Sequence, residues 1–460
     1  MSWPDATTIA ANVAAGRASA LSVTQAALAA IDAGNPALNA FTAITAERAL
    51  AAAAAIDAAI AAGKPVGPLA GVPFAVKNLF DIAGLVTRAG AALTATDPPA
   101  ARDAALVRKL EAAGAVLVGA LNMGEFAYDF TGENAHDGAC HNPHDLARMS
   151  GGSSSGSAAA VAGGLVPIAL CSDTNGSIRV PAALCGIFGL KPTYGRLSRA
   201  GSYPFVASLD HLGPVARSVA DLALVYDAMQ GTDADDPAQT PRPVEPVAGL
   251  LGRGTAGLRV AVAGGYFRAG AAPDCLAAVD AAARALGAVE IVEFPHVAQA
   301  RASAYLITAS EGSALHLQRL RAHAAGFDPD TRDRFLAGAM LPAAMVQHAQ
   351  RMRRWFAARC AEIFQRFDVV LFPATPCPAP LIGQKTIMLG EQEVPLRANL
   401  GVYTQPLSFI GLPVALAPVF APGRLPVGVQ IAAAPWREDL VLRVAASLEA
   451  TGVAAARPPE

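Results

Sequence analysis

Three short segments of the chain carry residue types that could together supply a base, a nucleophile and an oxyanion hole. Lys77 ends the apolar run of residues 73–77, in a chain with only five lysines. Residues 149–157 are rich in Gly and Ser, and residues 172–177 read Ser-Asp-Thr-Asn-Gly-Ser. Burial lowers the pKa of a lysine from about 10.4 toward neutrality, where the amine becomes a usable base. Ser177, on a sharp turn with converging backbone N–H groups, could combine a nucleophile with an oxyanion hole.

Each segment also has a purely structural interpretation. A lysine in a strand can bind loop carbonyls, a Gly/Ser segment can be a flexible loop, and Asn-Gly is a strong turn pair. Residues 152–156 match Gly-x-Ser-x-Gly with Ser154 at the centre, but a nucleophile elbow must follow a strand, and the preceding residues are polar loop. The same segment lacks the lysine of a phosphate-binding loop. The three segments are therefore more informative together than separately.

Taken together, these segments resemble the amidase-signature family. The resemblance implies that Lys77 is the base, that Ser153 is the bridging serine in a cis peptide, and that Ser177 is the acylated nucleophile. Ser153 and Ser177 also keep the family's separation of 24 residues. The resemblance to the family rests on four motifs: Gly71-Val-Pro-Phe-Ala-Val-Lys-Asn78, Gly151-Gly-Ser-Ser154, Ser172-Asp-Thr-Asn-Gly-Ser-Ile-Arg179 and Cys185-Gly-Ile-Phe-Gly-Leu-Lys-Pro-Thr193.

The family's chemistry is then expected of this chain. The resemblance implies an amidohydrolase that forms an acyl-enzyme and releases ammonia, without a metal or an organic cofactor. It implies an oxyanion hole built from the backbone of Thr174, Asn175, Gly176 and Ser177. A small-molecule amide is the implied substrate class.

Within the family, the chain is most similar to the 1-carboxybiuret hydrolases of cyanuric-acid breakdown. Asn175, where most family members carry Gly, supports this branch, as do residues 121–128, 201–205, 208–214 and 404–409. This branch implies that a small helical partner protein binds the chain, and it is compatible with a homo-oligomer. Two departures could reshape the substrate pocket: Ser155 replaces a usual Gly, and residues 138–142 differ from the usual Gly-Pro-x-x-Asn.

Candidate substrate-binding residues follow from their positions in the family pattern. Arg179 is a candidate cation for a carboxylated urea, with a structural arginine that pins the turn as the alternative. His136, His141, His144 and His211 lie near the motifs, but their spacing does not indicate a metal site, so structural or solvated roles are expected. The other candidates are Phe126, Tyr128, Thr131 and Ser154, with Tyr203 and Gln405 as weaker ones. For Phe126, Tyr128 and Thr131 the alternative is a place in the core.

Other function classes share parts of this pattern. The glutamine-hydrolysing component of an aspartyl- or glutamyl-tRNA amidotransferase has the same triad and would take ammonia from glutamine. A general small-molecule amidase is a further alternative. A non-enzymatic binding or scaffold protein is disfavoured because Lys77, Ser153 and Ser177 are all present.

Composition narrows the cellular context. The 460 residues are 53% hydrophobic and 16% charged, with a net charge of −2, so nothing indicates binding to nucleic acid or to an anionic membrane. Gly163, Gly164 and Pro167 interrupt the most apolar stretch, which is too short to span a membrane. Six widely spaced cysteines without Cys-x-x-Cys indicate buried thiols, and the first residues do not resemble a signal peptide. A cytoplasmic protein is expected.

The elements that must position these motifs alternate along the chain. Apolar runs at 73–76, 115–118, 166–170, 259–262, 369–372, 413–417 and 428–431 predict strands. Helices are predicted at 12–19, 24–33, 46–62, 104–113, 219–229, 274–286 and 343–367. This alternation predicts an α/β fold with a central mixed, mostly parallel sheet covered by helices on both faces.

We expect one domain over residues 1–460. Its predicted parts are an N-terminal helical segment (1–62), a catalytic region (65–220) and a C-terminal part (247–460) that completes the sheet and the substrate pocket. The Pro-rich residues 232–246 are predicted to be a surface loop or a junction between subdomains.

Overall fold

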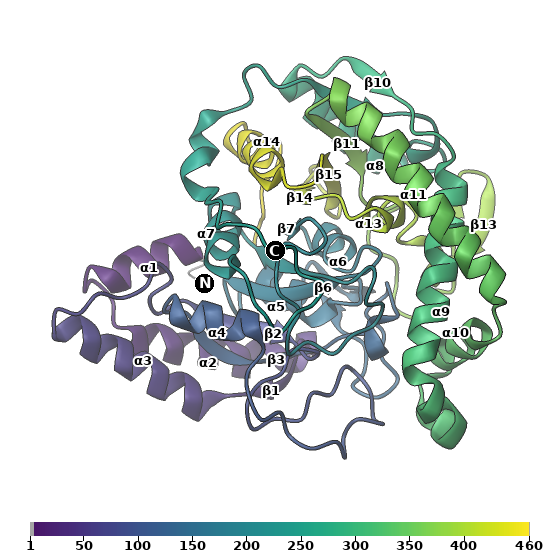
Figure 1. Cartoon of the computed structure of the whole chain (residues 1–460). Coiled ribbons are helices and arrows are strands. Elements are labelled where there is room, and N and C mark those ends of the chain that lie inside the picture. The colour runs from purple at the N-terminus through teal and green to yellow at the C-terminus, as the bar shows by residue number, and fades with distance from the viewer. Residues whose placement is uncertain (1–3, 460) are drawn as a thin grey trace.

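The computed structural model describes residues 4–459, and in this part of the chain eleven strands form one continuous sheet (Figure 1). From edge to edge the strand order is β1-β3-β2-β6-β8-β7-β14-β15-β11-β9-β10. The strands are β1 (Phe41–Ile44), β2 (Pro73–Lys77), β3 (Val116–Leu121), β6 (Ile168–Asp173), β7 (Phe188–Lys191), β8 (His211–Ala216), β9 (Val260–Ala263), β10 (Glu290–Val292), β11 (Val369–Pro373), β14 (Val414–Val419) and β15 (Val427–Ala433).

The sheet is mixed, with its parallel pairs in two separate blocks. Strands β3, β2 and β6 are parallel, as are β11, β9 and β10, and the other neighbouring pairs are antiparallel. The predicted α/β class with a mixed central sheet is confirmed, and all seven predicted strands lie in this sheet. Strands β1, β7, β8 and β10 were not predicted. The antiparallel pairs of β7 and β8 keep parallel pairing from extending across the middle of the sheet.

Helices pack on both faces of the sheet. The predicted helices other than the first correspond to α2, α3, α4, α7, α8 and α11. The α-helices of the described residues are α1 (Ala6–Ala14), α2 (Ala20–Leu38), α3 (Ala46–Ala61), α4 (Ala105–Ala112), α5 (Ser155–Ala162), α6 (Arg179–Leu184), α7 (Val219–Met229), α8 (Pro273–Leu286), α9 (Val297–His323), α10 (Pro329–Ala339), α11 (Ala343–Arg366), α12 (Leu396–Asn399), α13 (Gln405–Phe409) and α14 (Glu438–Ala450).

The N-terminal helix was predicted in the wrong place. Residues 12–19 were expected to be helical, but α1 ends at Ala14, and Gly16 adopts a left-handed conformation in the turn that follows. Helix α1 begins earlier because Asp5 caps it, its carboxylate accepting the N–H of Thr8 at 2.8 Å. The carboxylate of Asp221, on α7, accepts two further N–H groups from the first turn of α1.

Helices α9 and α10 were missed by the sequence analysis. The buried face of α9 includes Ser303, Thr308, Gly312, Ser313 and His316, so its apolar periodicity is weak. These helices and α11 form the green group that stands beside the sheet in Figure 1. This group matters for the site because α9 and α10 contribute to the cavity described below.

Smaller features complete the fold. Two hairpins, β4 (His141–Asn142) with β5 (Asp145–Met149) and β12 (Thr386–Leu389) with β13 (Gln392–Pro395), lie outside the main sheet. Residues 232–246 contain neither helix nor strand, as predicted for a loop. Among residues 4–459 there is no helix with the length and apolar character needed to cross a bilayer. Residues 1–3, in the predicted N-terminal segment, and residue 460 lie outside the described residues.

The pairing of β2 with β6 creates the site. The two strands are parallel neighbours, with Val76 opposite Leu170, so their carboxyl ends meet at one edge of the sheet. Lys77 ends β2, and Ser172 and Asp173 end β6. Residues that are about 95 positions apart in the chain are therefore brought into contact.

Candidate active site

The amine of Lys77 lies between two serine hydroxyls. Its Nζ is 2.7 Å from the Oγ of Ser153 and 2.9 Å from the Oγ of Ser172. All three residues are buried. Ser172 stands in one of the motifs but was not predicted to be a site residue, and it is the parallel register of β6 against β2 that places it beside the amine.

Burial moves the pKa of Lys77 toward neutrality. The side chain is completely inaccessible to solvent, and this burial lowers the pKa of Lys77 to about 7. Lys109 and Lys191 show the structural alternative, because their amines bind backbone carbonyls, such as Gly231 O at 2.7 Å from Lys109 Nζ. Lys77 instead contacts hydroxyl groups that can exchange a proton with it.

The Gly/Ser segment holds Ser153 against Lys77 from the other side. The peptide bond between Gly152 and Ser153 is cis, as the resemblance implied. The Gly152 N–H donates to the carbonyl of Phe130 at 2.8 Å, and the Ser153 carbonyl accepts the N–H of Gly124 at 3.1 Å. Helix α5 follows immediately and packs against β2 and β6, so the segment is fixed at both ends.

Ser177 lies on the tight turn that joins β6 to α6. Gly176 has φ +143°, and a Cβ at this position would overlap the side chain of Thr404. The Thr404 hydroxyl donates to the carbonyl of Asn175 at 2.7 Å, which fixes the turn from the C-terminal part of the chain. Glycine is therefore required here for close approach of two segments.

The buried carboxylate of Asp173 anchors this turn. It accepts hydrogen bonds from Arg179 Nε at 2.9 Å and from the backbone N–H of Ile178 at 3.2 Å. Burial by itself would raise the pKa of Asp173, but the adjacent Arg179 guanidinium outweighs it and holds the pKa well below its usual range. Asp173 is therefore ionised at neutral pH.

Arg179 is part of this anchor and does not line the cavity. Its guanidinium is fully buried and also donates to the side chain of Gln430 at 2.6 Å and to the carbonyl of Thr404 at 3.1 Å. The position of Arg179 agrees with the alternative of a structural arginine that pins the turn, because its hydrogen bonds are made within the protein.

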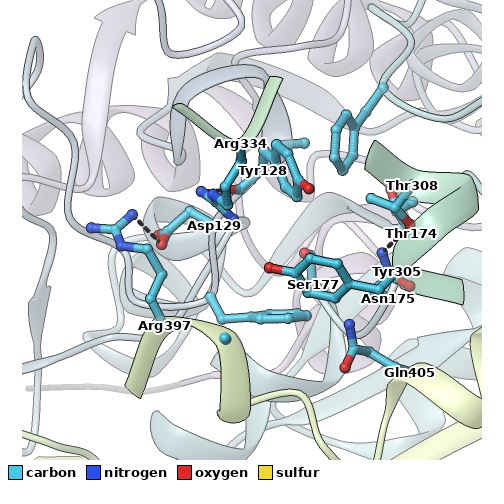
Figure 2. A pocket seen from close by; sticks show the side chains of 14 residues that line it. Tyr128, Asp129, Thr174, Asn175, Ser177, Tyr305, Thr308, Arg334, Arg397 and Gln405 are labelled. Atoms are coloured by element: carbon cyan, nitrogen blue, oxygen red, sulfur yellow. Dashed lines mark hydrogen bonds and ion pairs between the residues drawn. The ribbon is translucent and has the colours of Figure 1, made fainter. Parts of the chain in front are cut away.

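A cavity opens in front of Ser177 (Figure 2). It takes residues from five regions of the chain: the segment after β3, the turn of residues 174–177, the segment between β7 and β8, helices α9 and α10, and the segment from α12 to α13. The lining residues are Ala127, Tyr128, Asp129, Phe130, Thr174, Asn175, Ser177, Phe205, Tyr305, Thr308, Arg334, Arg397, Ala398 and Gln405.

The structure places only some of the predicted substrate residues at this cavity. Tyr128 and Gln405 line it, as does the turn of residues 174–177 through three of its four members. Phe126 instead packs in an aromatic cluster, 4.0 Å from His316 between ring centroids. The remaining candidates are used internally: Thr131 donates to Asp129, Ser154 donates to the carbonyl of Ser172, and Tyr203 packs against Phe126.

Two arginines at the cavity escaped the sequence analysis, and they differ in their charge partners. Arg397 is neutralised, with ion pairs to Asp129 at 2.7 Å, Asp330 at 3.2 Å and Glu133 at 3.5 Å. Arg334 donates to the backbone carbonyls of Tyr128 and Asp330. Its guanidinium stacks 3.9 Å from the centroid of the Tyr128 ring.

Arg334 therefore brings positive charge to the cavity wall without a carboxylate partner among these contacts, and an anionic ligand group would supply one. Nothing in its local sequence marks this arginine among thirty in the chain. Helix α10 places it at the cavity, and only the tertiary structure shows that.

Two side-chain amides complete the polar wall opposite Arg334. Arg301 Nε donates to the Oε1 of Gln405 at 2.8 Å, which directs the NH₂ of that amide away from the arginine. The Nδ2 of Asn175 donates to the hydroxyl of Thr308 at 2.9 Å. In Figure 2 these amides lie on the side of Tyr305 and Thr308, across from Asp129 and Arg397.

The histidines near the motifs are used within the structure. His136 contacts the carboxylate of Glu125 at 2.9 Å, and the Nδ1 of His211 is 3.0 Å from the carbonyl of Asp173. His141 contacts the carbonyl of Leu146, and His144 that of Cys185. Within residues 4–459 no three His, Cys, Asp or Glu side chains are grouped so that they could hold a metal ion.

Comparisons with known proteins point in one direction. A family model described as Amidase matches residues 22–442. AtzE, a component of the 1-carboxybiuret hydrolase of Pseudomonas sp. (strain ADP), is 53% identical over 445 residues, which is 96% of this chain and 97% of that protein. A component of the glutamyl-tRNA(Gln) amidotransferase of Anaeromyxobacter dehalogenans (strain 2CP-C) is 40% identical over 483 residues, with 98% and 96% covered.

Solved structures agree with the sequence relatives. One is described as a vestigial protein complex that reveals the evolutionary origins of an s-triazine catabolic enzyme. It matches with a TM-score of 0.98 and 51% identity, over 99% of this chain and 100% of that one. A crystal structure of an amidase matches with a TM-score of 0.88 and 31% identity, over 97% and 100%.

Proposed function

Because the chain belongs to the amidase family, we propose that its substrate is 1-carboxybiuret, whose terminal C–N bond it hydrolyses with release of ammonia. Family membership confirms the prediction of an amidohydrolase that acts on C–N bonds. The observation that carries the substrate is the 53% identity to AtzE over nearly the whole of both chains. The cation of Arg334, at the same cavity as Ser177, supports it, because 1-carboxybiuret carries a carboxylate.

In the proposed reaction, Lys77 and Ser153 relay a proton for Ser177. Neutral Lys77 takes the proton of the Ser153 hydroxyl, 2.7 Å away, while Ser153 takes the proton of Ser177 as its oxygen attacks the substrate carbonyl. The relay then returns the proton to the leaving NH₂ group, which departs as ammonia. Water hydrolyses the acyl-enzyme by the same route in reverse.

The turn of residues 174–177 is proposed to stabilise the negative charge that forms on the carbonyl oxygen. Its backbone N–H groups are held in place by the Asp173 anchor and by the Thr404 hydroxyl, so they need no rearrangement during the reaction. Losing one such donor typically reduces the rate by about 10² to 10³. The rigidity of the turn is thus part of the proposed mechanism.

Arg334 is proposed to bind the carboxylate of the substrate. Arg334 lies on α10, and the Tyr128 ring against which it stacks keeps the guanidinium in one orientation. Tyr128 and Gln405 are proposed to contact the ureido groups between the carboxylate and Ser177. Arg179 has no role of this kind because its hydrogen bonds are all directed into the protein.

The amidotransferase alternative is more distant. The glutamyl-tRNA(Gln) amidotransferase components compared are 40% identical or less, against 53% for AtzE.

We further propose that the protein acts in the cytoplasm as one domain. By analogy with the solved vestigial complex, we propose that it assembles with a small helical partner protein, with a homo-oligomer as the alternative assembly.

The test is ammonia release by the purified protein with 1-carboxybiuret, glutamine and propionamide offered in parallel. Wild type should hydrolyse 1-carboxybiuret, and Ser177→Ala should be inactive because the attacking oxygen is gone. Ser154→Ala is the matched control: it lies in the same Gly/Ser segment but donates to the carbonyl of Ser172. We expect it to retain turnover.

Each other outcome contradicts a stated part of the proposal. Turnover of glutamine in place of 1-carboxybiuret would favour the amidotransferase function. An inactive Ser154→Ala combined with an active Ser177→Ala would favour the nucleophile elbow. No turnover of any substrate, even after a helical partner protein is added, would contradict the proposed substrate.

A further inference from the structure

The side chain of Asn175 leaves a buried hydrogen-bond acceptor unused at the cavity. Its Oδ1 is buried and has no partner, although the residue lies two positions before Ser177. Within residues 4–459, only one other cavity-lining residue, Tyr128, has a buried polar side-chain atom in this state. Leaving a buried acceptor unpaired is costly, so such an atom next to a nucleophile indicates a ligand that supplies a donor.

The amide nitrogen has a partner, whereas the oxygen has none within the described part of the chain. The Nδ2 of Asn175 donates to the hydroxyl of Thr308, on α9, at 2.9 Å, and Thr308 also lines the cavity. The backbone of Asn175 is fixed separately, because its carbonyl accepts the hydroxyl of Thr404 at 2.7 Å. Figure 2 shows the contact between Thr308 and Asn175 beside the Ser177 turn.

We propose that Asn175, positioned by Thr308, selects ureido substrates by accepting the N–H that adjoins the scissile carbonyl. This inference rests on the proposed function and deepens it. A urea carries an N–H at this place, whereas an ordinary carboxamide carries a CH₂ group that cannot donate. An amide oxygen can only accept, so a CH₂ group opposite it leaves the oxygen unpaired in the complex. Sites built in this way discriminate strongly against analogues that lack the donor.

Two small probes isolate this one contact. 3-Ureidopropionate and glutaramate have the same length, the same terminal carboxylate and the same CONH₂ group. They differ only in an NH or a CH₂ beside the carbonyl. Their dissociation constants can be measured by calorimetry in a Ser177→Ala background, where neither is hydrolysed.

The parent Ser177→Ala protein should bind 3-ureidopropionate at least about tenfold more tightly than glutaramate, the equivalent of one net hydrogen bond. Adding Asn175→Ala should bring the ratio close to one while keeping the backbone N–H of the turn. Thr308→Val keeps the shape of the side chain but frees the amide, and should lower the ratio. Thr308→Ser keeps the hydroxyl and should restore it. If Asn175 had a merely structural role, its substitution would weaken the binding of both probes equally.

An unchanged ratio in Asn175→Ala, or a ratio near one in the parent protein, would overturn the inference. So would failure of the parent to bind either probe. If Asn175→Ala does not fold, the pair Thr308→Val and Thr308→Ser still decides. Wild-type turnover of 1-carboxybiuret is measured separately, so loss of the proposed function is distinguishable from loss of this contact.

Discussion

Lys77 and Lys191 are both completely buried, yet their neighbours give them different chemistry. Lys191 binds carbonyl oxygens, which can only accept, so its amine serves as a donor in the structure. Lys77 lies between the hydroxyls of Ser153 and Ser172, which can also donate. Burial disfavours the charged amine in both lysines, but of the two only the neutral form of Lys77 would lie beside hydroxyl groups that can donate a proton to it.

The pKa of Lys77 predicts the pH dependence of the reaction. In the proposed mechanism the neutral amine is the active form. Because burial lowers the pKa of Lys77 to about 7, kcat/KM should rise with pH and level off above that value. Well below pH 7 it should fall about tenfold per unit. The measurement is a pH–rate profile of ammonia release between pH 5 and 9.

Glu125 requires a control in this experiment, because burial also raises the pKa of its carboxyl to about 7. Glu125→Gln removes that titration while keeping a side chain of the same shape. The midpoint should stay near 7 in this variant if Lys77 is responsible. A midpoint that disappears with Glu125, or a flat profile, would contradict the role given to Lys77.

The partner of Arg334 can be tested with matched substrates. Arg334→Gln removes the charge, so KM for 1-carboxybiuret should rise about 10- to 100-fold, as expected for loss of a charge-assisted hydrogen bond of roughly 1.5 to 3 kcal/mol. Biuret lacks only the carboxylate, and its turnover or binding should change little. Equal losses for both compounds would show that Arg334 supports the cavity without binding the anion.

At the level of single elements, parallel pairing and turn geometry build the site. Strands β2 and β6 bring Lys77 to Ser172, and the absence of a side chain at Gly176 lets Thr404 pack closely against the turn after β6. The N-terminal helices illustrate how other elements are held. The carboxylate of Asp57, on α3, accepts the N–H groups of Ala20 and Leu21 at 2.7 and 3.0 Å, which caps α2 from a neighbouring helix.

Asp57→Ala should therefore destabilise the N-terminal helices. Loss of a cap typically costs about 1 to 2 kcal/mol, and here two backbone donors and the Ser19 hydroxyl lose their acceptor together. Urea unfolding measures the change in free energy, and Asp32→Ala, an exposed position on α2, is the control. Equal effects of the two substitutions would show that the Asp57 contacts contribute nothing specific.

Across the whole molecule, the sheet joins the regions that were expected to be separate parts of one domain. Strand β7 of the catalytic region pairs with β14 of the C-terminal part. Arg179 crosses the same junction, since it binds Asp173 on one side and Gln430 and Thr404 on the other. The turn that carries Ser177 is thus held by residues more than 200 positions away in the chain.

Arg179→Met should lower the free energy of unfolding by about 3 to 5 kcal/mol, because it leaves the Asp173 carboxylate buried without its cation. Arg437→Met removes an exposed partner of Asp439 and should cost less than about 1 kcal/mol. Denaturant unfolding of both variants gives the comparison. A stable Arg179→Met with a raised KM would instead support the substrate role suggested by its place in the motif.

The sequence by itself determined the local chemistry of this protein. Lys77, Ser153 and Ser177 stand in short motifs whose composition is readable without coordinates, and the similarity to amidases follows from them. The strands that carry these motifs were predicted for the same reason, because a fully buried strand is a continuous apolar run. Contacts within a motif join residues that are close in the sequence, so the local conformation of the motif largely determines them.

Only the tertiary structure decided what surrounds the motifs. Arg334, Thr308 and Arg397 reach the cavity from three different elements, and no spacing in the chain relates them to Ser177. The same assembly turned Arg179 away from the cavity, because Asp173 and Gln430 take its hydrogen bonds. Substrate recognition depends on such long-range packing, and α9, which supplies Thr308, has too weak an apolar pattern to be located from sequence.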